Sequence, residues 1–238
     1  GCGGDRAFRE CWLKRAAPGA DAAVAARGSR VPWTSGVRRT AAERLAAQRR
    51  SREAELERSE RRGRPGNPVL YLDVSLAGAP PRRMVFVTYM RESPNAAENF
   101  RLLCVGEGAA RLRGGTFYRV IDNFIDQAGA VGASGSALNG GQFDDDAGGL
   151  ALRHDRPGLL SMANGGPNTN TNHFSVVMSA APHLDGHYTV FGELVQGMDV
   201  ALAINALASG KPGDRPRKTV NIVGAGQLGT MPWEGTGH

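Results

Sequence analysis

Apolar and polar residues alternate along residues 70–76, where Leu or Val occupies every second position. Such alternation predicts a β-strand with one buried face. A stretch containing Gly and Pro at 78–81 predicts a turn, and the apolar run at 84–88 predicts a second strand. Together these segments predict a β-hairpin.

Two later segments carry apolar residues at helical spacing. Ser93 followed by Pro94 is typical of a helix start, and Gly106 is typical of a helix end. A second helix is predicted at about 197–208 and a last strand at 219–223. Short strands between Gly-rich loops, without βαβ alternation, predict a closed or nearly closed β-barrel with helical caps.

The first 67 residues differ from the rest of the chain. Residues 1–37 have no sustained periodicity, whereas residues from about 38 to 62 are good helix formers and begin with a capping-box pattern, Thr40 and Glu43. This predicted helix has few large apolar residues. Gly and Pro at 63–66 predict its end, so we divide the chain into a basic extension (1–67), a globular domain (68–228) and a C-terminal tail (229–238).

Charge separates the same two regions. Residues 1–67 hold 16 Lys and Arg against 8 Asp and Glu, whereas residues 68–228 hold 13 against 14. A basic arm on a nearly neutral domain favours association, and we expect it to dock on a protein partner rather than on the barrel. Nucleic acid is the less favoured partner, because aromatic residues are not interleaved along the arm.

Other features limit location and chemistry. No apolar run approaches the ~20 residues of a membrane span, so we expect no transmembrane segment. Three cysteines cannot form a disulfide framework. The sequence begins with Gly1 rather than Met, which suggests a removed targeting segment and favours an organelle, plastid or mitochondrion, over the cytoplasm.

Three patterns suggest cofactor or metal sites but lack the context these sites need. Residues 224–229 match GxGxxG, yet too few residues follow for a dinucleotide-binding unit, so we expect these glycines to end a strand. His183 and His187 flank a turn signal rather than lying on a helix. The acidic residues 144–146 lack EF-hand spacing and predict a solvated loop. We therefore expect no metal and no cofactor.

Several longer motifs occur together in the globular domain. Residues 117–127 read FYRVIDNFIDQ, residues 157–170 read PGLLSMANGGPNTN, and residues 97–103 read AENFRLL. With the closing Gly-Gln-Leu at 226–228, this domain resembles the cyclophilin family of peptidyl-prolyl cis-trans isomerases. The resemblance implies a mainly β fold, an eight-stranded antiparallel barrel capped by two helices. It also implies a proline-containing peptide or protein as substrate.

The chemistry implied by the resemblance needs neither a nucleophile nor a metal. Rotation about an X–Pro bond breaks amide resonance and has a barrier of ~20 kcal/mol. A cation beside the prolyl amide can stabilise the transition state more than the ground state. Arg119 matches the catalytic arginine, and Gln127 matches a donor to the substrate carbonyl. Phe124 matches a pocket wall.

The remaining matched positions complete a substrate-binding site. Ala163 and Asn164 match the backbone edge that pairs with the peptide, and Phe174 and Leu184 match positions on the pocket strand and floor. The full set implied for substrate binding is Phe124, Ile125, Gln127, Ala163, Asn164, His173, Phe174, Ser175, His183, Leu184 and Tyr188.

Four of these positions hold a residue other than the usual one of the family, and a fifth holds one that the family also uses. Ile125 stands where a Met is usual, His173 where a Gln is usual, and Ser175 where a Phe is usual. His183 occupies a rim position that holds Trp or His, and Tyr188 one that usually holds His. Loss of the aromatic wall at Ser175 weakens proline binding, since burial of an aromatic contributes ~1.5–3 kcal/mol. The alternative interpretation is a catalytically degraded cyclophilin-fold subunit of a large assembly, docked by its arm.

Overall fold

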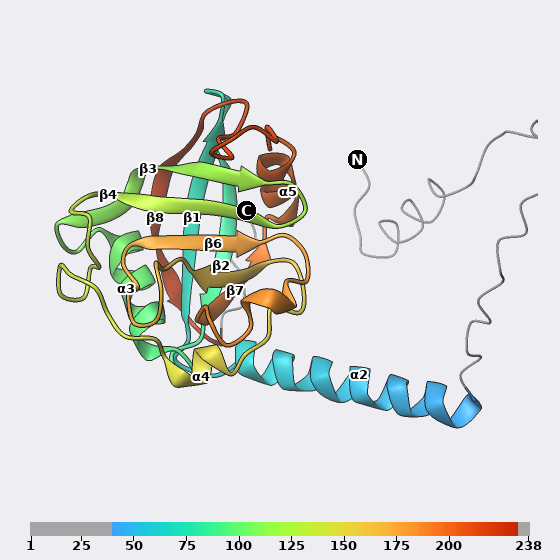
Figure 1. The fold of residues 1–238 in the computed structure, drawn as a ribbon. Coiled ribbons are helices and arrows are strands. Elements are labelled where there is room, and N and C mark those ends of the chain that lie inside the picture. Colours follow the sequence, from blue (N-terminus) through green and yellow to red (C-terminus); the bar gives the residue numbers. More distant parts are fainter. Residues whose placement is uncertain (1–39, 233–238) are drawn as a thin grey trace, which may run out of the picture. The chain divides into compact units, whose positions relative to one another are not determined.

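The computed structural model describes residues 40–232, which form a closed β-barrel with helices (Figure 1). Every strand pairs antiparallel with its neighbours, in the order β1-β2-β7-β5-β6-β4-β3-β8. The strands are β1 (Pro68–Leu76), β2 (Arg82–Thr88), β3 (Ala110–Ile121), β4 (Ile125–Gly132), β5 (Leu159–Met162), β6 (His173–Val177), β7 (Val190–Gln196) and β8 (Val220–Thr230). The predicted eight-stranded antiparallel barrel is confirmed, as is the hairpin of β1 and β2.

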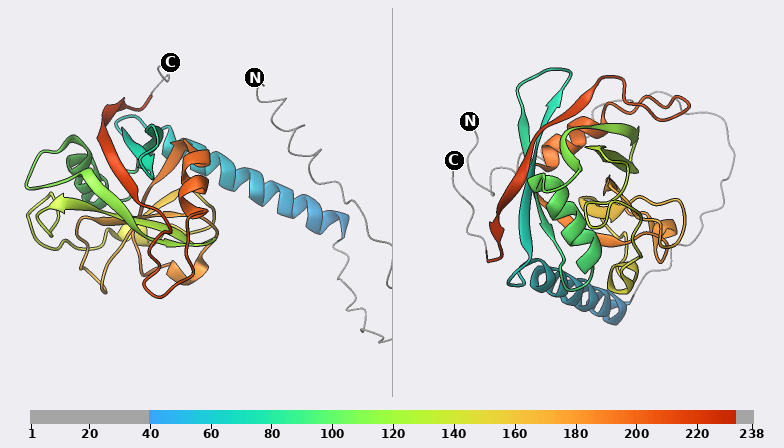
Figure 2. Two further views of the ribbon diagram at one scale, coloured as in Figure 1. Left: turned by 90° about the horizontal axis from the view of Figure 1, so that it is seen from above. Right: turned by 90° about the vertical axis from the view of Figure 1, so that its left-hand side faces the viewer.

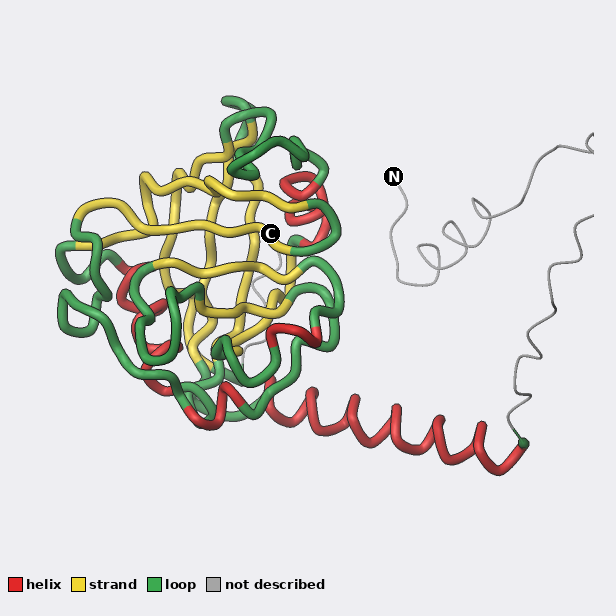
Figure 3. The backbone as a smooth tube through the Cα atoms, in the orientation of Figure 1, coloured by secondary structure: helices red, strands yellow, loops and turns green. Residues whose placement is uncertain are grey.

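Two helices lie at opposite ends of the barrel, as the views from the front and from the side show (Figures 1 and 2). These are α3 (Pro94–Val105) and α5 (Met198–Asn205). Gly106 adopts the left-handed conformation that ends α3, as its position in the sequence predicts. The other helices are α2 (Ala41–Arg62), the four-residue α4 (Ala147–Leu150) and the 3₁₀ turn η1 (Pro182–Leu184). Figure 3 shows the loops, in green, that join the strands of the barrel, in yellow.

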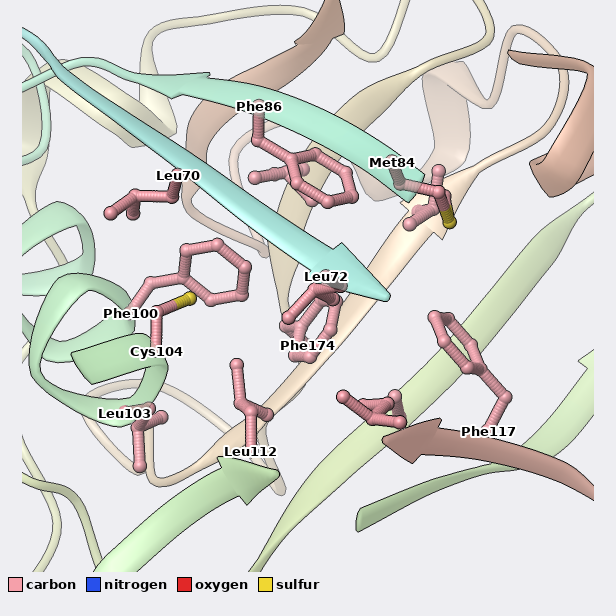
Figure 4. Packing of buried hydrophobic residues seen from close by; sticks show 14 of the residues in the cluster. Leu70, Leu72, Met84, Phe86, Phe100, Leu103, Cys104, Leu112, Phe117 and Phe174 are labelled. Atoms are coloured by element: carbon pink, nitrogen blue, oxygen red, sulfur yellow. The ribbon is translucent and has the colours of Figure 1, made fainter. Parts of the chain in front are cut away.

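Aromatic packing fills the barrel. Phe100 of α3 lies 4.9 Å from Phe174 of β6 and 5.4 Å from Phe191 of β7, measured between ring centroids. Phe117 of β3 lies 6.2 Å from Phe174 on another side. Figure 4 shows Phe100, Phe117 and Phe174 converging with Leu70, Leu72 and Leu112. The core therefore joins one helix cap to strands from all round the barrel.

The glycines of residues 224–229 do not end a strand, contrary to the expectation from sequence. β8 continues through them to Thr230 and pairs with β1. A Cβ on Gly226 would come within 2.8 Å of the Tyr71 ring, and one on Gly224 within 2.8 Å of the Asp73 carboxylate. The absence of side chains at Gly224 and Gly226 therefore leaves space for Tyr71 and Asp73, which reach over β8 from the neighbouring strand β1.

The prediction of a solvated acidic loop at residues 144–146 holds for the exposed Asp144 but was wrong for Asp146. Asp146 is buried, and its carboxylate accepts hydrogen bonds from the backbone N–H groups of Asn95 (3.2 Å) and Ala96 (2.9 Å). These donors lie in the first turn of α3 and have no partner within the helix. Ser93, the predicted cap, instead donates its hydroxyl to Val190 O. A residue about 50 positions away thus caps the helix.

Helix α2 contacts the barrel through ion pairs. Arg58 lies 2.8 Å from Asp155 and Arg61 lies 3.8 Å from Glu92, while the Arg61 guanidinium lies 5.8 Å from the Tyr89 ring centroid. Just after the helix, Arg64 lies 2.6 Å from the same Glu92. The compact unit containing the barrel begins at Ala46. We expected the arm to dock on a partner rather than on the barrel. The C-terminal end of α2 contradicts this expectation. The barrel has little net charge, but Asp155 and Glu92 lie close enough to attract the arginines of this helix.

The start of α2 carries the predicted capping box. Thr40 N donates to the Glu43 carboxylate at 2.7 Å, and Glu43 N donates to Thr40 Oγ1 at 3.2 Å. The helix begins at Ala41 rather than at about 38. Residues 1–37 of the predicted extension lie outside the described residues.

We expect Asp146→Ala to lower the free energy of unfolding by about 1–2 kcal/mol, the usual cost of losing a helix cap. Chemical denaturation of the full chain measures this loss. Asp144→Ala is the matched control, because Asp144 is an exposed acid of the same loop. Equal stability of the two variants would contradict a capping role for Asp146.

Candidate active site

Four polar side chains form a row across four adjacent strands. Arg119 of β3 is paired in register with Gln127 of β4, Gln127 with Ser175 of β6, and Ser175 with Ser161 of β5. Figure 1 shows β3, β4 and β6 side by side on one wall of the barrel. Neighbouring strands lie about 4.8 Å apart, so residues paired in register share one patch of surface.

Strand alternation decides which side chains reach this patch. Phe174, directly before Ser175, is buried in the core against Phe100 and Phe117. Leu160, directly before Ser161, is likewise buried in the core. Since successive side chains of a strand point to opposite faces, Ser161 and Ser175 lie on the outer face of the barrel wall.

A pocket of about 140 Å³ lies over this row. It brings together nine of the twelve residues that the sequence suggested for the site, among them Arg119. The lining residues are Arg119, Phe124, Ile125, Gln127, Ser161, Met162, Ala163, Asn164, Ser175, Leu184 and Tyr188. Ser161 and Met162 were not singled out from sequence, although they lie inside the motif at 157–170.

The other three suggested residues lie next to the pocket rather than in its lining. Phe174 faces the barrel core, for the reason of alternation given above. The ring of His183 is exposed and stacks on Phe124, with centroids 5.1 Å apart. His173 sits at the start of β6 and contacts Tyr118, with the Tyr118 hydroxyl 3.1 Å from His173 Nδ1.

Arg119 is held from two sides while it remains partly open to solvent. Its Nε donates to Asp214 Oδ2 at 3.1 Å, and one terminal nitrogen donates to Gln127 Oε1 at 3.4 Å. The Arg119 side chain is 43% exposed. Asp214, which sequence reasoning missed, lies in the loop between α5 and β8, 95 residues further along the chain. The guanidinium is therefore oriented before any ligand binds.

Gln127 belongs to a hydrogen-bonded chain that ends at His173. Its Nε2 donates to the Tyr118 hydroxyl at 2.7 Å. Burial lowers the pKa of His173, which favours the neutral ring as an acceptor for the Tyr118 hydroxyl. Tyr118 and His173 thus orient the Gln127 amide from outside the pocket, and Tyr118 is a further residue that sequence reasoning missed.

Comparison with known proteins identifies the family of this chain. Residues 71–227 match the family described as cyclophilin type peptidyl-prolyl cis-trans isomerase/CLD. The chain belongs to the cyclophilin family. It is 36% identical over 181 residues to peptidyl-prolyl cis-trans isomerase D of Mycosarcoma maydis, an alignment that covers 69% of this chain and 45% of that relative. This cyclophilin chain thus spans less than half the length of the curated relative.

Among residues 40–232 of this cyclophilin, no group of three or more His, Cys, Asp and Glu side chains is arranged to hold a metal ion. Within the same residues, no helix combines the length and the apolar character that crossing a membrane requires.

A buried carboxylate supports the turn that carries Phe124. Asn205 of α5 donates from Nδ2 to Ile121 O at 2.9 Å and to Asp126 Oδ1 at 2.8 Å, and it accepts from Asn123 N at 3.0 Å. Asp126 is fully buried on β4 and lies between two residues of the pocket lining. Burial raises the pKa of Asp126 to about 7, although the Asn205 bond opposes the shift.

This pKa predicts a specific pH dependence of stability. The folded state holds a proton on Asp126 between about pH 4 and pH 7, where the unfolded carboxyl has lost it. The stability contributed by Asp126 is therefore fully present below about pH 4 and lost as pH rises through 7. In Asp126→Asn this loss is absent, and the neutral amide still accepts from Asn205.

We expect Asp126→Asn to gain roughly 1–3 kcal/mol relative to the parent chain between pH 4 and pH 8. Urea denaturation of both chains at several pH values measures this difference. Asp122→Asn, an exposed acid of the same turn, is the control and should show no such trend. Parallel stability profiles for parent and Asp126→Asn would contradict the raised pKa.

Proposed function

We propose that this cyclophilin catalyses the cis-trans isomerisation of X–Pro peptide bonds, with Arg119 as the catalytic residue. The observation that carries the proposal is the pairing of Arg119 with Gln127 at the edge of the 140 Å³ pocket. Membership of a family described as isomerases supports it, as does the printed name of the relative from Mycosarcoma maydis.

The proposed mechanism depends on selective stabilisation of the twisted amide. As the X–Pro bond rotates, resonance is lost and the lone pair returns to the prolyl nitrogen. The Arg119 guanidinium, oriented by Asp214 and Gln127, can donate to that nitrogen. This interaction is stronger in the transition state than in the planar ground state, which is the condition for a rate increase.

The other residues of the pocket bind the peptide rather than take part in the bond rotation. Phe124, Ile125 and Leu184 offer an apolar surface for a proline ring. Gln127 carries amide hydrogens that can donate to a substrate carbonyl. Ala163 and Asn164 directly follow β5 and offer a peptide edge beside the pocket.

The basic arm is a separate proposal. We infer that residues 1–45 of the extension, which hold nine Lys and Arg against four Asp and Glu, associate with a protein of acidic surface, and that nucleic acid is the less favoured partner. The comparisons favour the isomerase over a catalytically degraded assembly subunit. Co-purification with the full chain, compared with a chain lacking residues 1–45, tests the association. Equal recovery of the same proteins would contradict a role for that segment.

We expect Arg119→Ala to lower kcat/KM for a proline peptide at least tenfold, because the cation beside the amide is lost. The fold should persist, since the Arg119 side chain is partly exposed. Exchange NMR or a protease-coupled assay measures the rate, and circular dichroism checks the fold. Arg113→Ala is the matched control, since Arg113 is an exposed arginine of the same strand outside the pocket. Unchanged activity in Arg119→Ala would exclude this residue as the catalytic group.

A further inference from the structure

The floor of the pocket carries two serine residues on neighbouring strands, where a proline ring offers only CH₂ groups. Ser161 and Ser175 are paired in register on β5 and β6, and both line the pocket. Their exposed fractions are 2% and 6%, so both side chains are largely withdrawn from solvent. Burying such a hydroxyl under an apolar ring without a hydrogen-bond partner is unfavourable.

The residues behind Ser161 determine whether its hydroxyl donates or accepts a hydrogen bond on that side. His154, fully buried behind it, lies 3.0 Å from Asp185 Oδ1 through Nδ1 and 2.9 Å from Ser161 Oγ through Nε2. The pKa of Asp185 is lowered: burial alone would raise it, but the hydrogen bonds from His154 outweigh burial, so its carboxylate only accepts. His154 Nδ1 therefore carries the ring proton.

It follows that His154 Nε2 is an acceptor as long as the ring is neutral. Burial lowers the pKa of His154, which favours this neutral form despite the opposing effect of Asp185. The Ser161 O–H then donates to His154 Nε2. Toward the pocket, Ser161 Oγ presents lone pairs only and can accept one more hydrogen bond.

Ser175 has the complementary capacity. Within residues 40–232 its hydroxyl makes no hydrogen bond to another side chain or to the backbone, so its O–H is free to donate into the pocket. A ligand hydroxyl between the two serines would donate to Ser161 Oγ and accept from the Ser175 O–H. Both pocket hydroxyls would then be satisfied by one group on the ligand.

We propose that Ser161 and Ser175 form a subsite for a proline residue whose ring bears a hydroxyl group. The inference rests on the proposed function, because it assumes that the prolyl ring enters this pocket. Ser175 is a specificity-determining residue of the site, and His154 with Asp185 are positioning residues that act through Ser161. The substrate class is a hydroxyproline-containing peptide or protein.

The test compares three otherwise identical peptides that contain proline, trans-4-hydroxyproline or cis-4-hydroxyproline at one position. Calorimetric titration of the full chain gives Kd for each peptide, independently of turnover. We expect one hydroxyproline peptide to bind about threefold to tenfold more tightly than the proline peptide, as one or two net hydrogen bonds allow. In Ser175→Ala this preference should fall at least threefold, and in Ser175→Thr, which keeps the hydroxyl, it should persist.

Ser175→Phe gives a second readout, because its ring fills the subsite with apolar surface. This variant should bind the proline peptide more tightly and lose any preference for hydroxyproline. Proline binding as tight as both hydroxyproline epimers in the parent chain would overturn the proposal; it would indicate that water satisfies both serines. A preference that survives in Ser175→Ala would overturn it equally.

Exchange NMR on the same peptides separates this inference from the proposed function, with the uncatalysed rate of each peptide subtracted. Hydroxyl preference in binding without catalysed exchange would contradict the isomerase function and leave the subsite standing. Catalysed exchange without hydroxyl preference in binding would support the isomerase function and overturn the subsite. Absence of binding by all three peptides would overturn both.

Discussion

The alternation of β6, with Phe174 inside the barrel and Ser175 outside, is the constraint on which the site depends. Phe174 is fixed by its contacts with Phe100 of α3 and Phe117 of β3. A shift of one residue would turn the serine into the barrel core and the phenylalanine onto the outer face, at the cost of the aromatic core. With β6 held in this register, Gln127 and Ser161 on the neighbouring strands necessarily flank Ser175.

Strand register does not determine the position of the turn between β3 and β4 or the orientation of the Ser161 hydroxyl. Hydrogen bonds between buried polar groups do. The turn between β3 and β4 is tied to α5 by Asn205, and the Ser161 hydroxyl is tied to His154 and Asp185. Breaking such a bond leaves a buried group unsatisfied, which costs about 1–3 kcal/mol. The rigidity of the pocket walls therefore depends on residues that a ligand never touches.

The sequence allowed prediction of local features and of the barrel, but not of contacts between distant segments. The hairpin and the ends of α3 follow from alternation, from Pro94 and from Gly106, whose effects are local. The capping of α3 by Asp146 joins segments about 50 residues apart, and its acidic neighbours gave no local sign of it. Likewise, the motifs suggested nine residues of the pocket lining, whereas Tyr118 and Asp214 become visible as supports only in three dimensions.

In the proposed function, recognition of the ring and stabilisation of the rotating bond are assigned to different residues. Arg119 is oriented by Asp214 and Gln127 at the rim, and neither contact involves β5. The serines lie further along the row on β6 and β5, where a substitution changes which ring is preferred without displacing the guanidinium. Since uniform binding changes KM while interactions specific to the transition state change kcat, the proposal assigns the two ends of this row of side chains to different kinetic constants. A polar pocket floor is therefore compatible with an intact catalytic edge.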